Sequence, residues 1–123
     1  MLSGNDRTPR QTVGAFYTAV RAGRLEEAVA LTDPDVEIRP LLRPGRSVYL
    51  GHGGVGQLVH DLNKAYEGVE MEIGQIVVGN GPTVTMHVVL RPVNSPEPPR
   101  PAAVVHTFRN GLILAIESRT EPP

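Results

Sequence analysis

Cysteine and tryptophan are both absent from the 123 residues, and the aromatic side chains are limited to two phenylalanines and three tyrosines. Without cysteine the chain can form no disulfide, no thiolate metal site and no cysteine nucleophile. The scarcity of aromatic residues means that the core must consist mainly of Val, Leu, Ile and Ala side chains. These absences predict a small protein with a single aliphatic core.

Strong charge of either sign is also missing. The formal net charge is −1 and no block of like charges occurs, so nucleic acid and a membrane surface are not expected partners. No apolar run approaches the ~18 residues of a membrane span, and residues 1–10 lack the apolar segment of a signal peptide. We therefore expect a soluble protein in the cytoplasm.

The strongest local structure signal is the segment Ala102–Thr120, whose pattern predicts two β-strands joined by Asn110-Gly111. This dipeptide suits a two-residue type I′ turn, because both central residues of that turn need a positive φ. Apolar residues flank the dipeptide on both sides, and strands of about eight residues are long enough for the centre of a sheet. The segment therefore predicts a central β-hairpin.

Two helices are predicted before the first strand. The first begins after Thr8, which forms a capping box with Gln11, and ends at Gly23. The second covers about residues 24–31, where Asp33-Pro34-Asp35 ends it because the residue before proline avoids the helical region. The second helix is expected to bury its apolar side chains, Leu25, Ala28 and Val29.

A third helix is predicted over residues 55–66, after a turn at residues 51–54 and before a cap at Gly68. Alternation with a period of two predicts strands over residues 69–78 and 83–91. A shorter alternating segment predicts an additional strand at residues 36–39.

Five prolines fall between Pro92 and Pro101, which predicts a loop rather than an interior strand. A run of helices followed by a run of strands indicates an α+β fold, with the helices packed on one face of an antiparallel sheet. We expect one domain over residues 8–121, preceded by a flexible tail at residues 1–7.

This layout resembles the nuclear transport factor two-like superfamily, and within it the SnoaL-like polyketide cyclases and ketosteroid isomerase. The resemblance covers about residues 8–120 and is carried by Phe16–Leu25, Leu31–Glu37, Tyr49–Val55 and Val105–Gly111. It implies a curved antiparallel sheet wrapped around three N-terminal helices, a cone that encloses an apolar pocket. It also implies a homodimer, since dimers are common in the superfamily.

The catalytic residues of ketosteroid isomerase are replaced in this sequence. That enzyme uses a carboxylate base with a tyrosine and a protonated aspartic acid. The corresponding positions hold Phe16, Ile38 and Val104, so the sequence does not favour enolisation by that mechanism. A shift of one residue would instead place Tyr17, Glu37 or Arg39, and Val105 at these positions, so the shift restores only part of the site.

His106 is the candidate catalytic residue. It shares a strand face with Val104 and Phe108, and by the resemblance that face lines the pocket. A histidine there is a candidate acid or base, since its ordinary pKa is near physiological pH. The alternative is a core histidine satisfied by a hydrogen bond, because no carboxylate is an obvious partner for its ring.

The function predicted on this basis is binding of a small, mostly apolar molecule, with proton transfer as in a SnoaL-like cyclase or isomerase. Tyr17, Tyr49 and Ser118 are candidate supporting hydrogen-bond donors, and Ser118 is expected on the face of Leu114 and Ile116. The expected apolar wall comprises Phe16, Ile38, Leu62, Val104, Phe108 and Ile116. The alternative is a non-catalytic dimerising module whose pocket is filled by its own side chains.

Other patterns have weaker support. Gly51–Gly56 matches the dinucleotide-binding spacing G-x-G-x-x-G, but the strand before it is short and the sheet reads as antiparallel. The four histidines show no metal-ligand spacing. Glu37 and Arg39 share one strand face, where a solvated ion pair is the simpler interpretation. We therefore expect no cofactor and no metal.

Overall fold

The structure is a computed structural model that describes residues 8–40, 48–65, 69–79, 81–93 and 96–120. The tail predicted at residues 1–7 and the predicted end of the third helix at residues 66–68 lie outside the described residues. So do residues 41–47 and 80, and residues 94–95 of the predicted proline-rich loop. The elements are α1 Pro9–Ala22, α2 Leu25–Ala30, β1 Thr32–Arg39, β2 Tyr49–Leu50, α3 Gly51–Ala65, β3 Val69–Val78, β4 Thr83–Pro92, β5 Arg100–Arg109 and β6 Leu112–Thr120.

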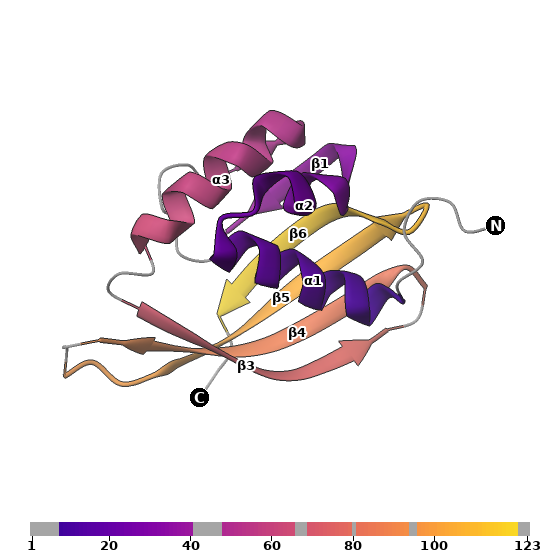
Figure 1. Cartoon of the computed structure of the whole chain (residues 1–123). Helices are drawn as coiled ribbons and strands as arrows, with labels where there is room; N and C mark the ends of the chain where they lie inside the picture. Colours follow the sequence, from indigo (N-terminus) through magenta and orange to yellow (C-terminus); the bar gives the residue numbers. More distant parts are fainter. Residues whose placement is uncertain (1–7, 41–47, 66–68, 80, 94–95, 121–123) are drawn as a thin grey trace.

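The six strands form one curved sheet in the order β2-β1-β6-β5-β4-β3, and the three helices lie on one face of it (Figure 1). The α+β fold with N-terminal helices is thereby confirmed. The expectation of a wholly antiparallel sheet is wrong at one place, because β1 pairs with β6 in parallel. The connection from β1 to β6 spans most of the chain, which leaves room for a parallel crossover.

The first helix has the ends that the sequence predicts. The Thr8 side chain accepts a hydrogen bond from the Gln11 backbone N–H, and the Gln11 side chain accepts one from the Thr8 N–H. Gly23 ends the helix in the left-handed conformation, with φ of 71°. The helix buries one face against the sheet, formed by Thr12, Val13, Phe16, Tyr17, Ala19 and Val20.

Two predicted boundaries and one predicted burial in the first half of the chain are wrong. β1 begins at Thr32 and not at residue 36, because the Ile113 N–H of β6 donates to the carbonyl of Leu31 at 3.0 Å and extends the pairing. The predicted turn at residues 51–54 is the first turn of α3. Leu25 of α2 is 42% exposed and not buried, whereas Ala28 is buried.

The loop predicted from Pro92 to Pro101 is shorter than expected, because Pro92 ends β4 and Pro101 belongs to β5. Pro101 lies opposite Val89 of β4, while the pairing of β5 with β6 ends at Ala102 and Thr120. Pro101 is therefore placed beyond the last described pair on its β6 side, where a missing N–H removes no ladder hydrogen bond.

The β5–β6 hairpin turns at Asn110 and Gly111, whose φ angles of 53° and 79° are both positive, as the type I′ prediction requires. The register shifts after Thr107, which pairs with Ala115, whereas the next residue, Phe108, pairs with Ile113. Leu114 is the extra residue of this β-bulge. As a result Ile113 and Ile116 are the buried residues, and the prediction that Leu114 shares the face of Ile116 is wrong.

The core lies between the concave face of the sheet and the helices, and it is mainly aliphatic, as the composition predicts. On β4 every second side chain is buried, and these are Val84, Met86, Val88 and Leu90. The alternate side chains, including His87, are half-buried on the other face. Among the described residues, no helix has both the length and the apolar character to cross a membrane.

Candidate functional site

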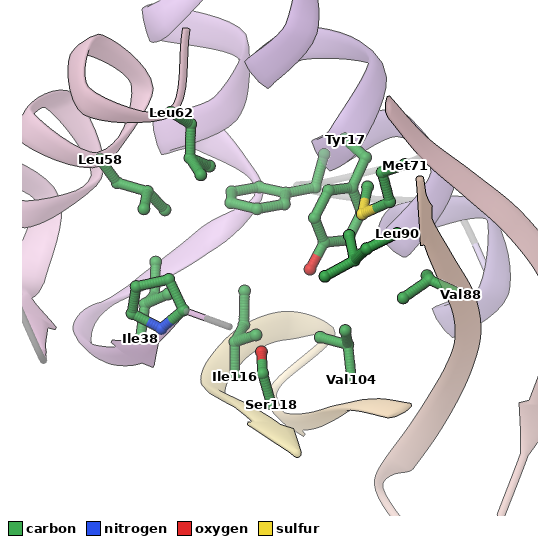
Figure 2. A pocket seen from close by; sticks show the side chains of 12 residues that line it. Tyr17, Ile38, Leu58, Leu62, Met71, Val88, Leu90, Val104, Ile116 and Ser118 are labelled. Carbon is green, nitrogen blue, oxygen red and sulfur yellow. The ribbon is translucent and has the colours of Figure 1, made fainter. Parts of the chain in front are cut away.

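A hollow lies between α1, α3 and the concave face of the sheet (Figure 2). The space that protein atoms leave unfilled there is about 490 Å³, including the part open to solvent. The wall consists of Phe16, Tyr17, Ile38, Pro40, Leu58, Leu62, Met71, Val88, Leu90, Val104, Ile116 and Ser118. Only Tyr17 and Ser118 of these residues carry a polar side chain, so the hollow is apolar with two hydroxyl groups.

Seven of the residues expected at the site surround this hollow, namely Phe16, Tyr17, Ile38, Leu62, Val104, Ile116 and Ser118. The wall also contains five residues that were not predicted from the sequence, which are Pro40, Leu58, Met71, Val88 and Leu90. The alternation along β4 was the available signal for Val88 and Leu90. It did not say which of the two faces of β4 is the concave one.

Tyr49 and Phe108 are buried but do not line the hollow. The hydroxyl of Tyr49 donates to a carboxylate oxygen of Asp61 at 2.7 Å, so this tyrosine joins β2 to α3. Phe108 lies next to the hairpin turn, and its backbone N–H donates to the carbonyl of Pro82 at 2.8 Å. The geometry places both residues in the structural core and not in the wall.

His106 lies behind the wall and not in it. Its side chain has no exposed surface, and Tyr17 stands against it, with the two rings edge to face and 5.5 Å between their centres. Nε2 of His106 is 2.9 Å from the hydroxyl oxygen of Tyr17, and Nδ1 is 3.1 Å from the carbonyl oxygen of Val84. Any effect of His106 on a molecule in the hollow must therefore act through Tyr17.

The His106 ring is neutral at physiological pH. Burial lowers its pKa from 6.5 to about 4, because the imidazolium form loses its hydration, and the hydrogen bond to Val84 offsets only part of that effect. A carbonyl oxygen can only accept, so Nδ1 carries the proton and Nε2 presents its lone pair to Tyr17. The hydroxyl of Tyr17 is therefore the donor of the Tyr17–His106 hydrogen bond.

Phe16, Ile38 and Val104, which replace the three catalytic residues of ketosteroid isomerase, all lie in the wall. The register shifted by one residue is excluded at two of its three positions. At the first of these, both candidates, Glu37 and Arg39, are exposed and form an ion pair with each other at 3.8 Å. Val105 lies on the opposite face of β5 from Val104. Tyr17 alone of the alternative set reaches the hollow.

The glycines of Gly51–Gly56 have a packing explanation. A Cβ built on Gly54 would lie 2.9 Å from the backbone carbonyl carbon of Tyr49, whereas one on Gly53 meets nothing within 4 Å. Gly54 thus allows α3 to start close against β2. This close approach accounts for Gly54 without a bound phosphate.

Replacing Gly54 or Gly53 by alanine is expected to change the free energy of unfolding in opposite directions. Gly54→Ala is expected to lower the free energy of unfolding by roughly 1–3 kcal/mol, because a rigid backbone atom must move. Gly53→Ala should raise it by about 0.5 kcal/mol, since alanine is the better helix former. Urea unfolding of both variants measures this, and equal effects would contradict the packing explanation.

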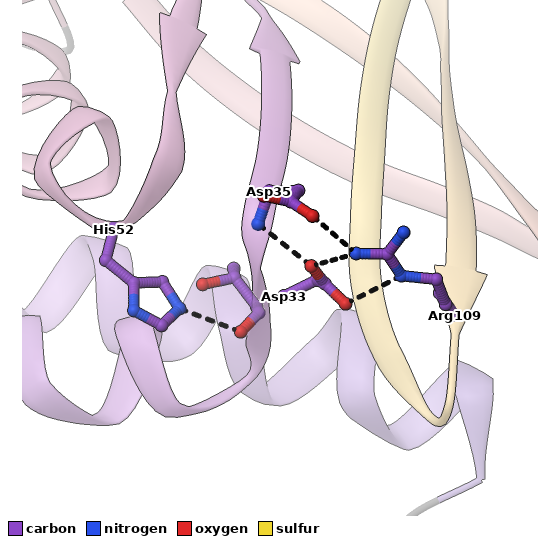
Figure 3. A network of polar contacts seen from close by, with 5 residues as sticks. Asp33, Asp35, His52 and Arg109 are labelled. Carbon is purple, nitrogen blue, oxygen red and sulfur yellow. Dashed lines mark hydrogen bonds and ion pairs between the residues drawn. The ribbon is translucent and has the colours of Figure 1, made fainter.

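A second polar network joins β1 to the hairpin (Figure 3). The guanidinium of Arg109 donates two hydrogen bonds to Asp33, at 2.7 and 3.0 Å, and one to Asp35 at 2.8 Å. The Arg109 bonds hold the pKa of the Asp33 carboxyl below its usual value of 3.8. The His52 ring lies nearby, and its Nε2 is 3.0 Å from the carbonyl oxygen of Thr32. Every group named here has a partner within the protein, so the network is structural.

Asp33→Asn is expected to lower the free energy of unfolding at neutral pH. The lowered pKa of Asp33 stabilises the folded state above pH 3.8, and this stabilisation is lost as the pH falls through the folded-state pKa. The difference between wild type and variant should therefore shrink in acid, which urea unfolding at several pH values can follow. Asp35→Asn, at a side chain that is mostly exposed, is the control with a smaller effect.

Metal ligands are not gathered anywhere in the part of the chain that the structure describes: no three His, Asp or Glu side chains there are placed to hold an ion. The site is defined instead by an apolar hollow, a tyrosine hydroxyl at its edge and a buried neutral histidine behind it.

A curved sheet packed on N-terminal helices around such a hollow is the architecture of the nuclear transport factor two-like superfamily. A family model described as the SnoaL-like domain matches residues 13–116, so the chain belongs to the SnoaL-like domain family. No curated protein matches the sequence at a significant level.

Solved structures of the same fold share little sequence with the chain. TerC, crystallised with polyporic acid, is 16% identical with a TM-score of 0.70, over 93% of this chain and 92% of that one. IdmH from Streptomyces antibioticus, described as a candidate polyketide cyclase, is 20% identical with a TM-score of 0.68, over 94% and 93%. A candidate polyketide cyclase from Sinorhizobium meliloti is 14% identical with a TM-score of 0.72, over 96% and 100%.

Proposed function

We propose that the protein binds a small, mostly apolar molecule in the hollow between α1, α3 and the sheet. The observation that carries this proposal is a hollow, open in part to solvent, in which Tyr17 and Ser118 are the only polar side chains among the described wall residues. Binding sites for small molecules typically combine an apolar wall with a few placed polar groups. The names of the neighbours, a protein crystallised with polyporic acid and two candidate polyketide cyclases, support a ring compound of polyketide type.

A thermal-shift screen against polyketides, terpenoids and steroids tests this proposal. A compound present at about a hundred times its Kd stabilises the folded state by about 2.7 kcal/mol. Val104→Phe fills part of the hollow, whereas Val105→Phe places the same ring on the other face of β5. The proposal expects a shift for wild type and Val105→Phe that is lost in Val104→Phe. A screen without any shift, or one unchanged in Val104→Phe, would contradict it.

Proton transfer, as in a SnoaL-like cyclase or isomerase, remains a prediction. A proton taken from a bound molecule would reach Tyr17 first, as the Tyr17 proton passes to His106 Nε2. The lowered pKa of His106 makes it a weak base, which favours binding over catalysis as the main role. Full activity of His106→Ala on a compound found by the screen would contradict a catalytic role for this histidine.

We further propose that the chain forms a homodimer through the outer face of its sheet. Uncharged side chains meet at the centre of this face, as in the pairs Thr85 with Val105 and Thr107 with Ala115, while Glu117 and Arg119 lie on the same face of β6. The same face serves the alternative function, a dimerising module that binds no ligand. Light scattering of wild type and of Val105→Arg measures the dimer, and a monomeric wild type would contradict it.

A further inference from the structure

The direction of the hydrogen bond between Tyr17 and His106 restricts what the hollow can bind. Tyr17 is 8% exposed at the hollow, whereas His106 is completely buried, so His106 cannot exchange its partner Tyr17 for bulk water. The two groups are 2.9 Å apart, and they come from α1 and β5, the helix and strand on opposite sides of the core. Phe16 supports the arrangement, because its ring stands edge to face against Tyr17 at 5.2 Å.

The position of each proton in the pair follows from its partners. The carbonyl oxygen of Val84 accepts from His106 Nδ1, which fixes the single proton of the neutral imidazole on that nitrogen. His106 Nε2 can then only accept, and Tyr17 must donate its one hydroxyl proton to it. After this donation the oxygen of Tyr17 has only lone pairs to offer another group.

That oxygen belongs to the wall of the hollow. Figure 2 shows the Tyr17 hydroxyl directed toward the strand residues Val104, Ile116 and Ser118. Ser118 is the one other wall residue with a polar side chain, and its hydroxyl can donate or accept. Tyr17 is therefore the group in the wall that can discriminate between a donor and an acceptor on a bound molecule.

We propose that Tyr17 meets the bound molecule as a hydrogen-bond acceptor, so that the hollow selects a hydroxyl-bearing compound, a phenol, enol or alcohol, over a ketone or ether. This inference rests on the proposed function. A carbonyl placed at Tyr17 would face lone pairs in an apolar environment. If Tyr17 turned its proton to that carbonyl, Nε2 of His106 would remain buried without a partner, and either arrangement costs free energy.

Three probes of one ring system test the inference: naphthol, its methyl ether and naphthaldehyde. Their Kd values are measured by calorimetry for wild type and Tyr17→Phe. We expect wild type to prefer naphthol roughly tenfold or more over both other probes, and Tyr17→Phe to lose this preference. Because the probes also differ in shape and hydrophobicity, the ratio of Kd values in Tyr17→Phe is the reference for the ratio in wild type.

Two variants of His106 provide a sharper test. In His106→Leu the Tyr17 proton has no internal acceptor, so the preference should change from naphthol to naphthaldehyde. His106→Gln can keep an amide oxygen facing Tyr17, and it should retain the preference for naphthol. If His106→Leu does not fold, the comparison of wild type, Tyr17→Phe and His106→Gln still decides the matter.

The possible failures are distinguishable. Binding of all three probes to wild type with the ratios of Tyr17→Phe would overturn the inference and leave the proposed function standing. A preference of wild type for naphthaldehyde would overturn it in the same way. Binding of none of the three would overturn both.

Discussion

Lowering the pH from 7 to about 4.5 is expected to reduce the free energy of unfolding by roughly 2 kcal/mol through His106 alone. The unfolded chain takes up a proton at a pKa of 6.5, whereas the folded protein resists it until about 4. Between these values the unfolded state binds more protons, so stability falls as the pH falls. The loss begins near pH 6.5 and is complete near pH 4.

The variant His106→Gln isolates this contribution. Glutamine does not titrate, so the slope of stability against pH between 4 and 6.5 should be flatter in the variant than in wild type. Urea unfolding of both proteins across this range measures the two slopes. Asp33 does not interfere, because it is present in both proteins and its contribution is lost mainly below its ordinary pKa of 3.8. Equal slopes would mean that His106 is not held neutral in the folded protein.

Phe16→Ala is expected to destabilise the protein by about 3–5 kcal/mol, the usual cost of removing a buried phenylalanine ring. Phe16 is 1% exposed, and it both lines the hollow and supports Tyr17. Such a loss is a large part of the ~5–15 kcal/mol that stabilises a typical domain. The variant should also bind apolar probes more weakly, because the Tyr17 ring loses its neighbour.

A control for this prediction lies two residues along the same helix. Thr18 is exposed and donates its hydroxyl proton only to the Gly14 carbonyl of the same helix. Thr18→Ala should change the free energy of unfolding by less than about 0.5 kcal/mol. Urea unfolding compares the two variants, and a similar small effect of Phe16→Ala would show that Phe16 does not carry the packing between α1 and the sheet.

The local elements of the fold were predictable because their signals are local. Thr8 and Gln11 cap a helix whatever lies elsewhere, and Asn110-Gly111 turns a hairpin because these residues tolerate a positive φ. The bulge at Leu114 was not predictable, since a single extra residue reverses the face of every later side chain and leaves no mark in the pattern.

The site was predictable only in part, because it depends on contacts between residues far apart in the sequence. Phe16, Ile38 and Val104 could be placed in the wall through the resemblance, and the structure brings them together. The hydrogen bond between Tyr17 and His106 joins residues 89 positions apart in the sequence, so no spacing rule could predict it. Because Tyr17 stands between His106 and the hollow, His106 lies behind the wall and not, as the sequence had predicted, in it.

The most direct test of the binding function is a crystal structure of the protein soaked with naphthol. We expect the compound inside the hollow, with its ring against Val104 and Ile116 and its hydroxyl within hydrogen-bond distance of the Tyr17 oxygen. A structure in which the wall side chains close the hollow, or in which naphthol binds only elsewhere, would contradict the proposed binding function.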